Sequence, residues 1–95
     1  MARRPLNLPV QQRFPQITYR RGAAGIPTPE VSGTGVRVQT IVIAAVRWGQ
    51  SHEKIATDYD LTLAQVEEAL AFYAAHGAEI DRAIEAEQTL EAAQA

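Results

Sequence analysis

The stretch Ser51–Tyr73, SHEKIATDYDLTLAQVEEALAFY, decides the fold, because it contains the start signals of two helices separated by one short break. Ser51 is a favourable N-cap residue, and Thr62 is followed three residues later by Gln65, which is the pattern of a capping box. Leu61 sits where it can fill the corner between the two helices. Apolar residues of the second segment recur at helical spacing, at Val66, Ala69, Leu70 and Tyr73. The pattern predicts a helix-turn-helix unit.

Helices are also predicted on both sides of this unit. From Gln39 onward the apolar residues again follow helical spacing, at Ile41, Ala44, Ala45 and Trp48, and Gly49 is placed to end that helix. Beyond the unit, Gly77 is a plausible C-cap residue. Residues 78–92 then form an acidic helix with a narrow apolar stripe of Ile80, Ala83 and Ile84.

The N-terminal third has a different character. Residues 1–16 contain three prolines and predict an extended arm, whereas residues 16–20 are β-branched and aromatic enough for a short strand. Residues 22–35 are rich in glycine and proline and predict a loop without a regular element, and residues 36–38 could pair with the first strand.

The expected fold is therefore mainly α, with a homeodomain-like helix-turn-helix core, a short N-terminal β-element and a C-terminal helix. We expect an arm over residues 1–16, a domain over 17–77 and the acidic helix over 78–95. Because the core is small and short strands leave unpaired edges, the protein is expected to form a homodimer.

Charge is distributed unevenly along the 95 residues. Residues 1–50 hold seven arginines and one acid, whereas residues 51–95 hold two basic residues and ten acids. A basic half joined to an acidic half favours two different partner surfaces, although a merely solvated surface has the same pattern. With no cysteine, no apolar run long enough for a membrane span and no signal-peptide core, the sequence is typical of a cytoplasmic protein.

No catalytic or metal-binding pattern is found in the sequence. His52 and His76 lack the spacing of metal ligands, and the paired carboxylates lie in alanine-rich helical segments. We therefore expect a protein that binds a partner, without enzymatic activity, cofactor or metal.

The second helix of the unit is poorly suited to reading DNA. Its exposed positions are mostly alanine and glutamate, and it offers no arginine or asparagine to a base edge. Any DNA binding is instead expected to use phosphate or minor-groove contacts by Arg20, Arg21, Arg37 and Arg47.

Residues 17–80 resemble domain-of-unknown-function family 433, whose members are often described as VapB-type antitoxins. The matching residues are Ile17-Thr18, Pro29, Val31, Gly33-Thr34, Val36, Val38, Gly49, Ser51, Glu53, Ile55, Tyr59, Leu61-Thr62, Val66, Ala69-Leu70 and Tyr73. The family's arginine after Gly-Thr is Gly35 here, and Arg37 follows two residues later. The resemblance implies a dimeric antitoxin that neutralises a PIN-like ribonuclease toxin and in many systems binds its own operator DNA.

Within that reading, the C-terminal helix is the expected toxin-binding element, through Ile80, Arg82 and Ile84. Its narrow apolar stripe could lie in a groove of the toxin, or it could pack on the helix's own domain or on a second subunit. Two other functions stay open, namely a free-standing helix-turn-helix DNA-binding regulator and a structural assembly module.

Overall fold

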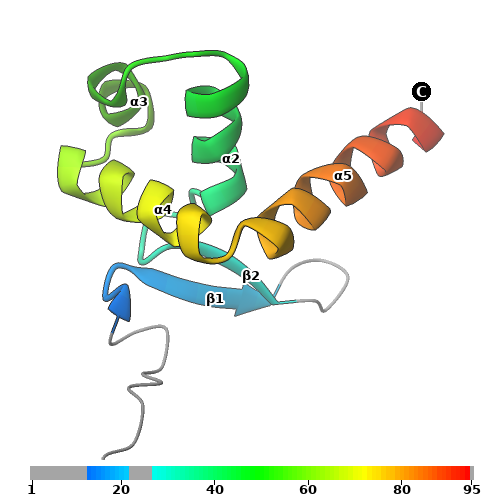
Figure 1. The fold of residues 1–95 in the computed structure, drawn as a ribbon, viewed down its shortest axis with the longest axis horizontal. Helices are drawn as coiled ribbons and strands as arrows, with labels where there is room; N and C mark the ends of the chain where they lie inside the picture. Colours follow the sequence, from blue (N-terminus) through cyan, green and yellow to red (C-terminus); the bar gives the residue numbers. More distant parts are fainter. Residues whose placement is uncertain (1–12, 22–26, 95) are drawn as a thin grey trace, which may run out of the picture.

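The computed structural model describes residues 13–21 and 27–94, apart from the side chains of residues 91 and 94. These residues form a small, mainly helical domain in which an antiparallel two-stranded hairpin precedes four helices (Figure 1). The elements are β1 (Ile17–Arg21), β2 (Pro27–Val31), α2 (Val38–Val42) continued by the π-helical turn η1 (Ile43–Arg47), α3 (His52–Tyr59), α4 (Leu63–Ala75) and α5 (Gly77–Gln94).

The predicted helix-turn-helix unit is present as α3 and α4. The Ser51 hydroxyl accepts a hydrogen bond from the Lys54 amide at 3.0 Å and so caps α3. The capping box at Thr62 and Gln65 is complete, with bonds of 3.0 and 2.9 Å. Asp60 ends α3 in the left-handed region at φ 58°. Each helix therefore begins at the residue that the sequence predicts.

One apolar core joins the helices to the hairpin. The largest fully buried side chains are Phe72, Ile17, Ile41, Ile55, Ile80, Ile84, Val31, Val38, Val42 and Val66. Phe72 of α4 meets Phe14 edge-on, with 5.2 Å between the ring centroids. Phe14 lies in the segment expected to be an extended arm, but a bend at Phe14 and a turn at residues 15–16 accompany the burial of its ring in this core. Residues 1–12 of that arm lie outside the described residues.

The second strand corrects the sequence prediction. Residues 27–31 were expected in a loop but form β2, which pairs with β1 in the register Ile17↔Val31. The amide of Ser32 donates to the carbonyl of Gln16 at 2.8 Å, so even-numbered residues bond across the hairpin. The backbone nitrogens of Pro27 and Pro29 therefore face away from β1. Proline is tolerated at such positions of a strand, because no hydrogen bond to the neighbouring strand is lost there. Residues 36–38, expected to pair with β1, instead reach β2 through the bridge Glu30↔Arg37.

The helix after the hairpin changes its pitch. Its N-terminal part is α-helical, but residues 43–47 form a π-turn in which the Trp48 amide donates to the Ile43 carbonyl at 3.1 Å. The wider turn rotates the following side chains relative to α-helical spacing. Ile41 and Ala44 are buried as expected, whereas Trp48 lies on the surface. Trp48 shares the helical spacing of Ile41 and Ala44 in the sequence, but it does not share their burial.

The last helix follows α4 almost directly. Gly77, expected to cap α4, is instead the first residue of α5, and His76 alone separates the two helices. Ile80 and Ile84 are fully buried against the domain, and the helix then continues beyond it (Figure 1). None of the helices over residues 13–21 and 27–94 is long and apolar enough to cross a membrane.

Candidate functional site

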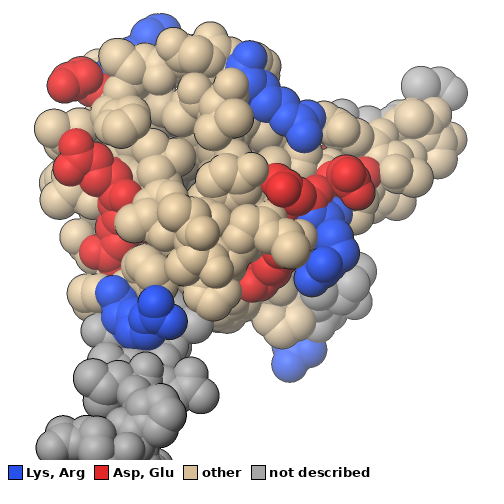
Figure 2. All heavy atoms as spheres, in the orientation of Figure 1, with Lys and Arg blue, Asp and Glu red and all other residues tan. Residues whose placement is uncertain are grey.

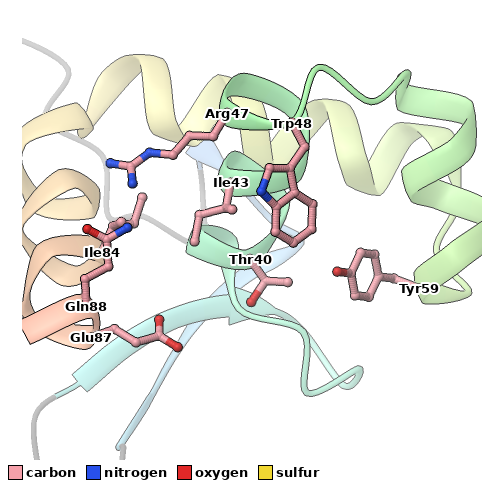
Figure 3. A pocket seen from close by; sticks show the side chains of 8 residues that line it. All are labelled: Thr40, Ile43, Arg47, Trp48, Tyr59, Ile84, Glu87 and Gln88. Carbon is pink, nitrogen blue, oxygen red and sulfur yellow. The ribbon is translucent and has the colours of Figure 1, made fainter. Parts of the chain in front are cut away.

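A groove between η1, α3 and α5 has a volume of about 410 Å³. Its lining residues come from three helices and are Thr40, Ile43, Arg47, Trp48, Tyr59, Ile84, Glu87 and Gln88. Figure 3 shows the two aromatic side chains on one side of the groove and Arg47, Gln88 and Glu87 on the other. The groove is therefore an apolar cleft with charged groups along one wall.

The π-turn and Gly49 after it determine where Trp48 lies, one of the two aromatic residues of the groove. Gly49 adopts φ +67°, a left-handed conformation that lets the chain leave the helix directly after Trp48. Trp48 is left 64% exposed and Val46 60% exposed. Two large apolar side chains this exposed and this close in sequence are typical of a surface that contacts another molecule.

The charged wall is built around Glu87. Its carboxylate accepts a hydrogen bond from the Gln39 side chain at 2.5 Å and lies 3.4 Å from the Arg37 guanidinium. Gln39 is itself buried. These contacts neutralise Glu87 and hold α5 against α2. Arg47, by contrast, has no ion pair within the part of the chain that the structure describes, so its charge is available to a partner.

A second, smaller groove lies on the other flank of α5. It has a volume of about 290 Å³ and is lined by Pro27, Thr28, Pro29, Glu79, Arg82, Ala83 and Ala86. At its edge the Tyr19 hydroxyl donates to the Glu79 carboxylate at 2.9 Å. Burial raises the pKa of Tyr19 well above its usual value, and the hydrogen bond to Glu79 and that residue's charge add to the shift. This contact fixes the first turn of α5 to the hairpin.

The comparison with known families covers the wall of the first groove that η1 and α3 form. Residues 28–73 match the family model described as "Protein of unknown function (DUF433)". This segment belongs to the DUF433 family. The comparisons with curated proteins and with solved structures find no match.

The boundaries of the DUF433 segment divide the groove. The segment contains η1, α3 and most of α4, and so supplies Trp48, Tyr59 and Arg47. The opposite wall, with Ile84, Glu87 and Gln88, belongs to α5 and lies outside the segment. The groove therefore combines a family surface with a helix that the family model does not cover.

Of the four arginines expected to bind DNA, two are neighbours on β1, one directly precedes α2 and one is the last residue of η1. Arg20 is 3.1 Å from Glu30, whose side chain is only 5% exposed, and Arg37 pairs with Glu87. Arg21 is exposed at the end of β1, whereas Arg47 lies at the far end of the α2–η1 helix from the hairpin. On the face shown in Figure 2, basic side chains are interspersed with acidic ones. DNA binding by these residues stays a prediction, without a continuous basic patch on that face to support it.

The glutamates of α4 make contacts with other parts of the chain. Glu68 accepts a hydrogen bond from the Gln16 amide at 2.6 Å, and Glu67 lies 3.8 Å from His52. These contacts connect α4 to the segment before β1 and to α3. Glu67 and Glu68 therefore have a structural role that their charge in the sequence did not indicate.

The residues expected to bind a toxin are divided between core and surface. Ile80 and Ile84 are fully buried, so they could reach a partner only if α5 left its own domain, whereas Arg82 is exposed beside the second groove. Sequence reasoning overlooked Val46 and could not decide whether Trp48 is buried or exposed, because a π-turn has no local sequence signal. Within residues 13–21 and 27–94 no three histidine or acidic side chains gather as a metal site.

Proposed function

We propose that this protein is the antitoxin of a toxin–antitoxin pair and that it binds and neutralises a PIN-like ribonuclease. It acts by binding, not by catalysis. The observation that carries the proposal is the exposure of Trp48, which lines the 410 Å³ groove, together with that of Val46 two residues earlier in the chain. Tryptophan is enriched among the residues that dominate binding energy at protein interfaces.

The resemblance of the sequence to VapB-type antitoxins supports a nuclease as the protein that covers this surface. The charge of the helix beside the groove is a second support. Exposed acids on α5, including Asp81 and Glu85, would meet the basic surface that an RNA-cleaving enzyme needs for its substrate. The toxin would then lose both its docking surface for RNA and access to its active site.

The proposal places the main toxin contact on the groove rather than on the buried stripe of α5. Ile80 and Ile84 hold α5 in the core, and Arg82 stays a candidate contact on the exposed side of that helix. Binding to operator DNA is retained as a further part of the proposal, through Arg20 and Arg21 on β1.

The experiment takes a PIN-like ribonuclease from the operon that encodes this chain, where the operon contains one, and measures its inhibition by the purified full-length protein with a labelled RNA substrate. Trp48→Ala should weaken inhibition at least about tenfold, because it removes the central apolar contact. The matched control is Leu63→Ala, which truncates an exposed apolar residue on α4 away from the groove. This control should change inhibition by less than about twofold.

The outcomes separate the two parts of the proposal. Equal inhibition by the wild type and by Trp48→Ala would remove the groove from the mechanism while leaving the antitoxin role intact. Failure of the wild-type protein to inhibit the neighbouring nuclease at any ratio would contradict the antitoxin role itself.

A further inference from the structure

Several polar side chains that line the first groove have no partner in the described part of the chain. They are Arg47, Trp48, Tyr59 and Gln88, none of which forms a side-chain hydrogen bond or ion pair there. Their free groups are mostly donors, namely a guanidinium, an indole N–H, a hydroxyl and an amide. Figure 3 shows the Tyr59 hydroxyl pointing into the groove. A partner that excludes water here must supply acceptors, because a buried donor without a partner is costly.

The charges of the groove favour an anionic partner group. Among the described residues that line it, only Arg47 and Glu87 are charged. Glu87 is already compensated, since it lies 3.4 Å from the Arg37 guanidinium and accepts a hydrogen bond from Gln39. The charge of Arg47 has no such compensation. An anionic group is therefore complementary to the groove, whereas a basic group would be repelled by Arg47.

Apolar surface lies directly beside this charge. In Figure 3, Ile43 lies between the Trp48 ring and the Arg47 side chain, whose guanidinium extends toward α5. Trp48 is 64% exposed, so most of its ring is open to contact. An arginine guanidinium binds a carboxylate through two parallel hydrogen bonds, which fixes the direction of the bound group. The groove thus has one position for an apolar side chain and one for a carboxylate.

We propose that the groove binds a segment of the nuclease in which a large apolar side chain is next to a carboxylate. This inference rests on the proposed function and names the chemistry of that contact. The apolar side chain packs on Trp48 and Ile43, and the carboxylate accepts hydrogen bonds from Arg47. A single carboxylate fits better than the backbone of a nucleic acid. One arginine suffices for the carboxylate, whereas exposed acids of α5 such as Glu85 would repel a chain of phosphates.

Variants of Arg47 test the carboxylate contact through the kinetics of binding to the ribonuclease used above. Arg47→Gln should raise the dissociation constant at least about tenfold, mainly through faster dissociation, because hydrogen bonds of the bound state are lost. Arg47→Lys should lose less, since it keeps the charge without the paired geometry. Lys54→Gln is the matched control, as it removes one exposed positive charge of α3 outside the groove. It should change the dissociation constant by less than about twofold.

Fluorine NMR of the full chain labelled with fluorotryptophan reports on the groove itself. Trp48 is the only tryptophan of the chain, so the spectrum contains a single signal. This signal should shift when the nuclease binds the wild-type protein. It should shift equally for Arg47→Gln at saturating nuclease, because the apolar contact is retained. The RNA substrate alone should leave the signal unchanged.

The possible failures of this inference differ from a failure of the antitoxin role. Equal affinities of the wild type and Arg47→Gln would overturn the carboxylate contact and leave that role intact. Slower association of Arg47→Gln with unchanged dissociation would reduce Arg47 to long-range attraction and overturn the contact as well. A fluorine signal that moves with RNA and not with the nuclease would assign the groove to nucleic acid. A wild-type protein that does not bind the nuclease would contradict both proposals.

Discussion

The two ends of α5 are alike in composition but have opposite roles. The first two turns contain Ile80 and Ile84, both fully buried, and are tied to the hairpin through Glu79. The last turns extend past the domain, and Leu90 there is 62% exposed (Figure 1). The same alanine-rich, acidic helix is thus part of the core at one end and a projecting surface at the other. An apolar stripe on a helix therefore does not reveal by itself whether its partner is internal.

Truncation should give the largest difference in stability between the two ends of α5. Removing residues 78–95 deletes both buried isoleucines and exposes the core surfaces of α2 and α4, so the cooperative unfolding transition should be lost. Removing only residues 89–95 should lower the free energy of unfolding by less than about 1 kcal/mol. Urea unfolding followed by circular dichroism measures both. A folded protein that ends at Gly77 would show that α5 is dispensable for the domain.

Point variants make the same comparison without changing the length of the chain. Ile80→Ala should cost about 2–5 kcal/mol, because it removes a buried side chain and leaves a cavity. Leu90→Ala should stay within about 0.5 kcal/mol of the wild type. The two free energies of unfolding come from denaturant titrations. Similar losses for the two variants would mean that the projecting turns are also packed in solution.

Glu87 lies at the boundary between the two ends and should have an intermediate effect. Glu87→Ala removes the acceptor of the buried Gln39 amide and should cost about 1–3 kcal/mol. Glu87→Gln keeps an acceptor oxygen and loses only the exposed ion pair with Arg37, which is worth at most about 1 kcal/mol. Chemical denaturation at low and high salt distinguishes them. Equal losses for both substitutions would assign the contact to charge rather than to the hydrogen bond.

These comparisons also explain how much of the structure the sequence could predict. Ser51, Thr62 and Gln65 act on amides three residues away, so their role is local and the helix-turn-helix was predictable. The strand β2 was not predicted, because Pro27 and Pro29 are typical of a loop. Only the register of the hairpin shows that their nitrogens face away from β1. The direction of Trp48 depends on a π-turn, and the burial of Ile80 and Ile84 depends on how α5 folds back over α2. Both are set by tertiary packing.

The smallest expected effect concerns the hydrogen bond between Tyr19 and Glu79, which anchors the packed end of α5. Tyr19→Phe should cost about 1 kcal/mol near neutral pH, since one hydrogen bond to a carboxylate is lost. The pH dependence is more diagnostic. The pKa of Tyr19 is raised in the folded protein, so above about pH 10 the unfolded chain loses this proton first. The stability that Tyr19 contributes is therefore complete below that pH and falls as the pH rises further.

In the phenylalanine variant this part of the alkaline decline should disappear. Some decline should persist, because the hydrogen bond to Asp81 also raises the pKa of Tyr73. Glu79→Gln is the matched control, as it keeps an acceptor for the Tyr19 hydroxyl but removes the negative charge, and it should give a shallower alkaline decline than the wild type. Urea midpoints measured from pH 8 to about pH 11 provide the comparison. Parallel curves for the wild type and Tyr19→Phe would show that the hydroxyl does not hold α5 to the hairpin in solution.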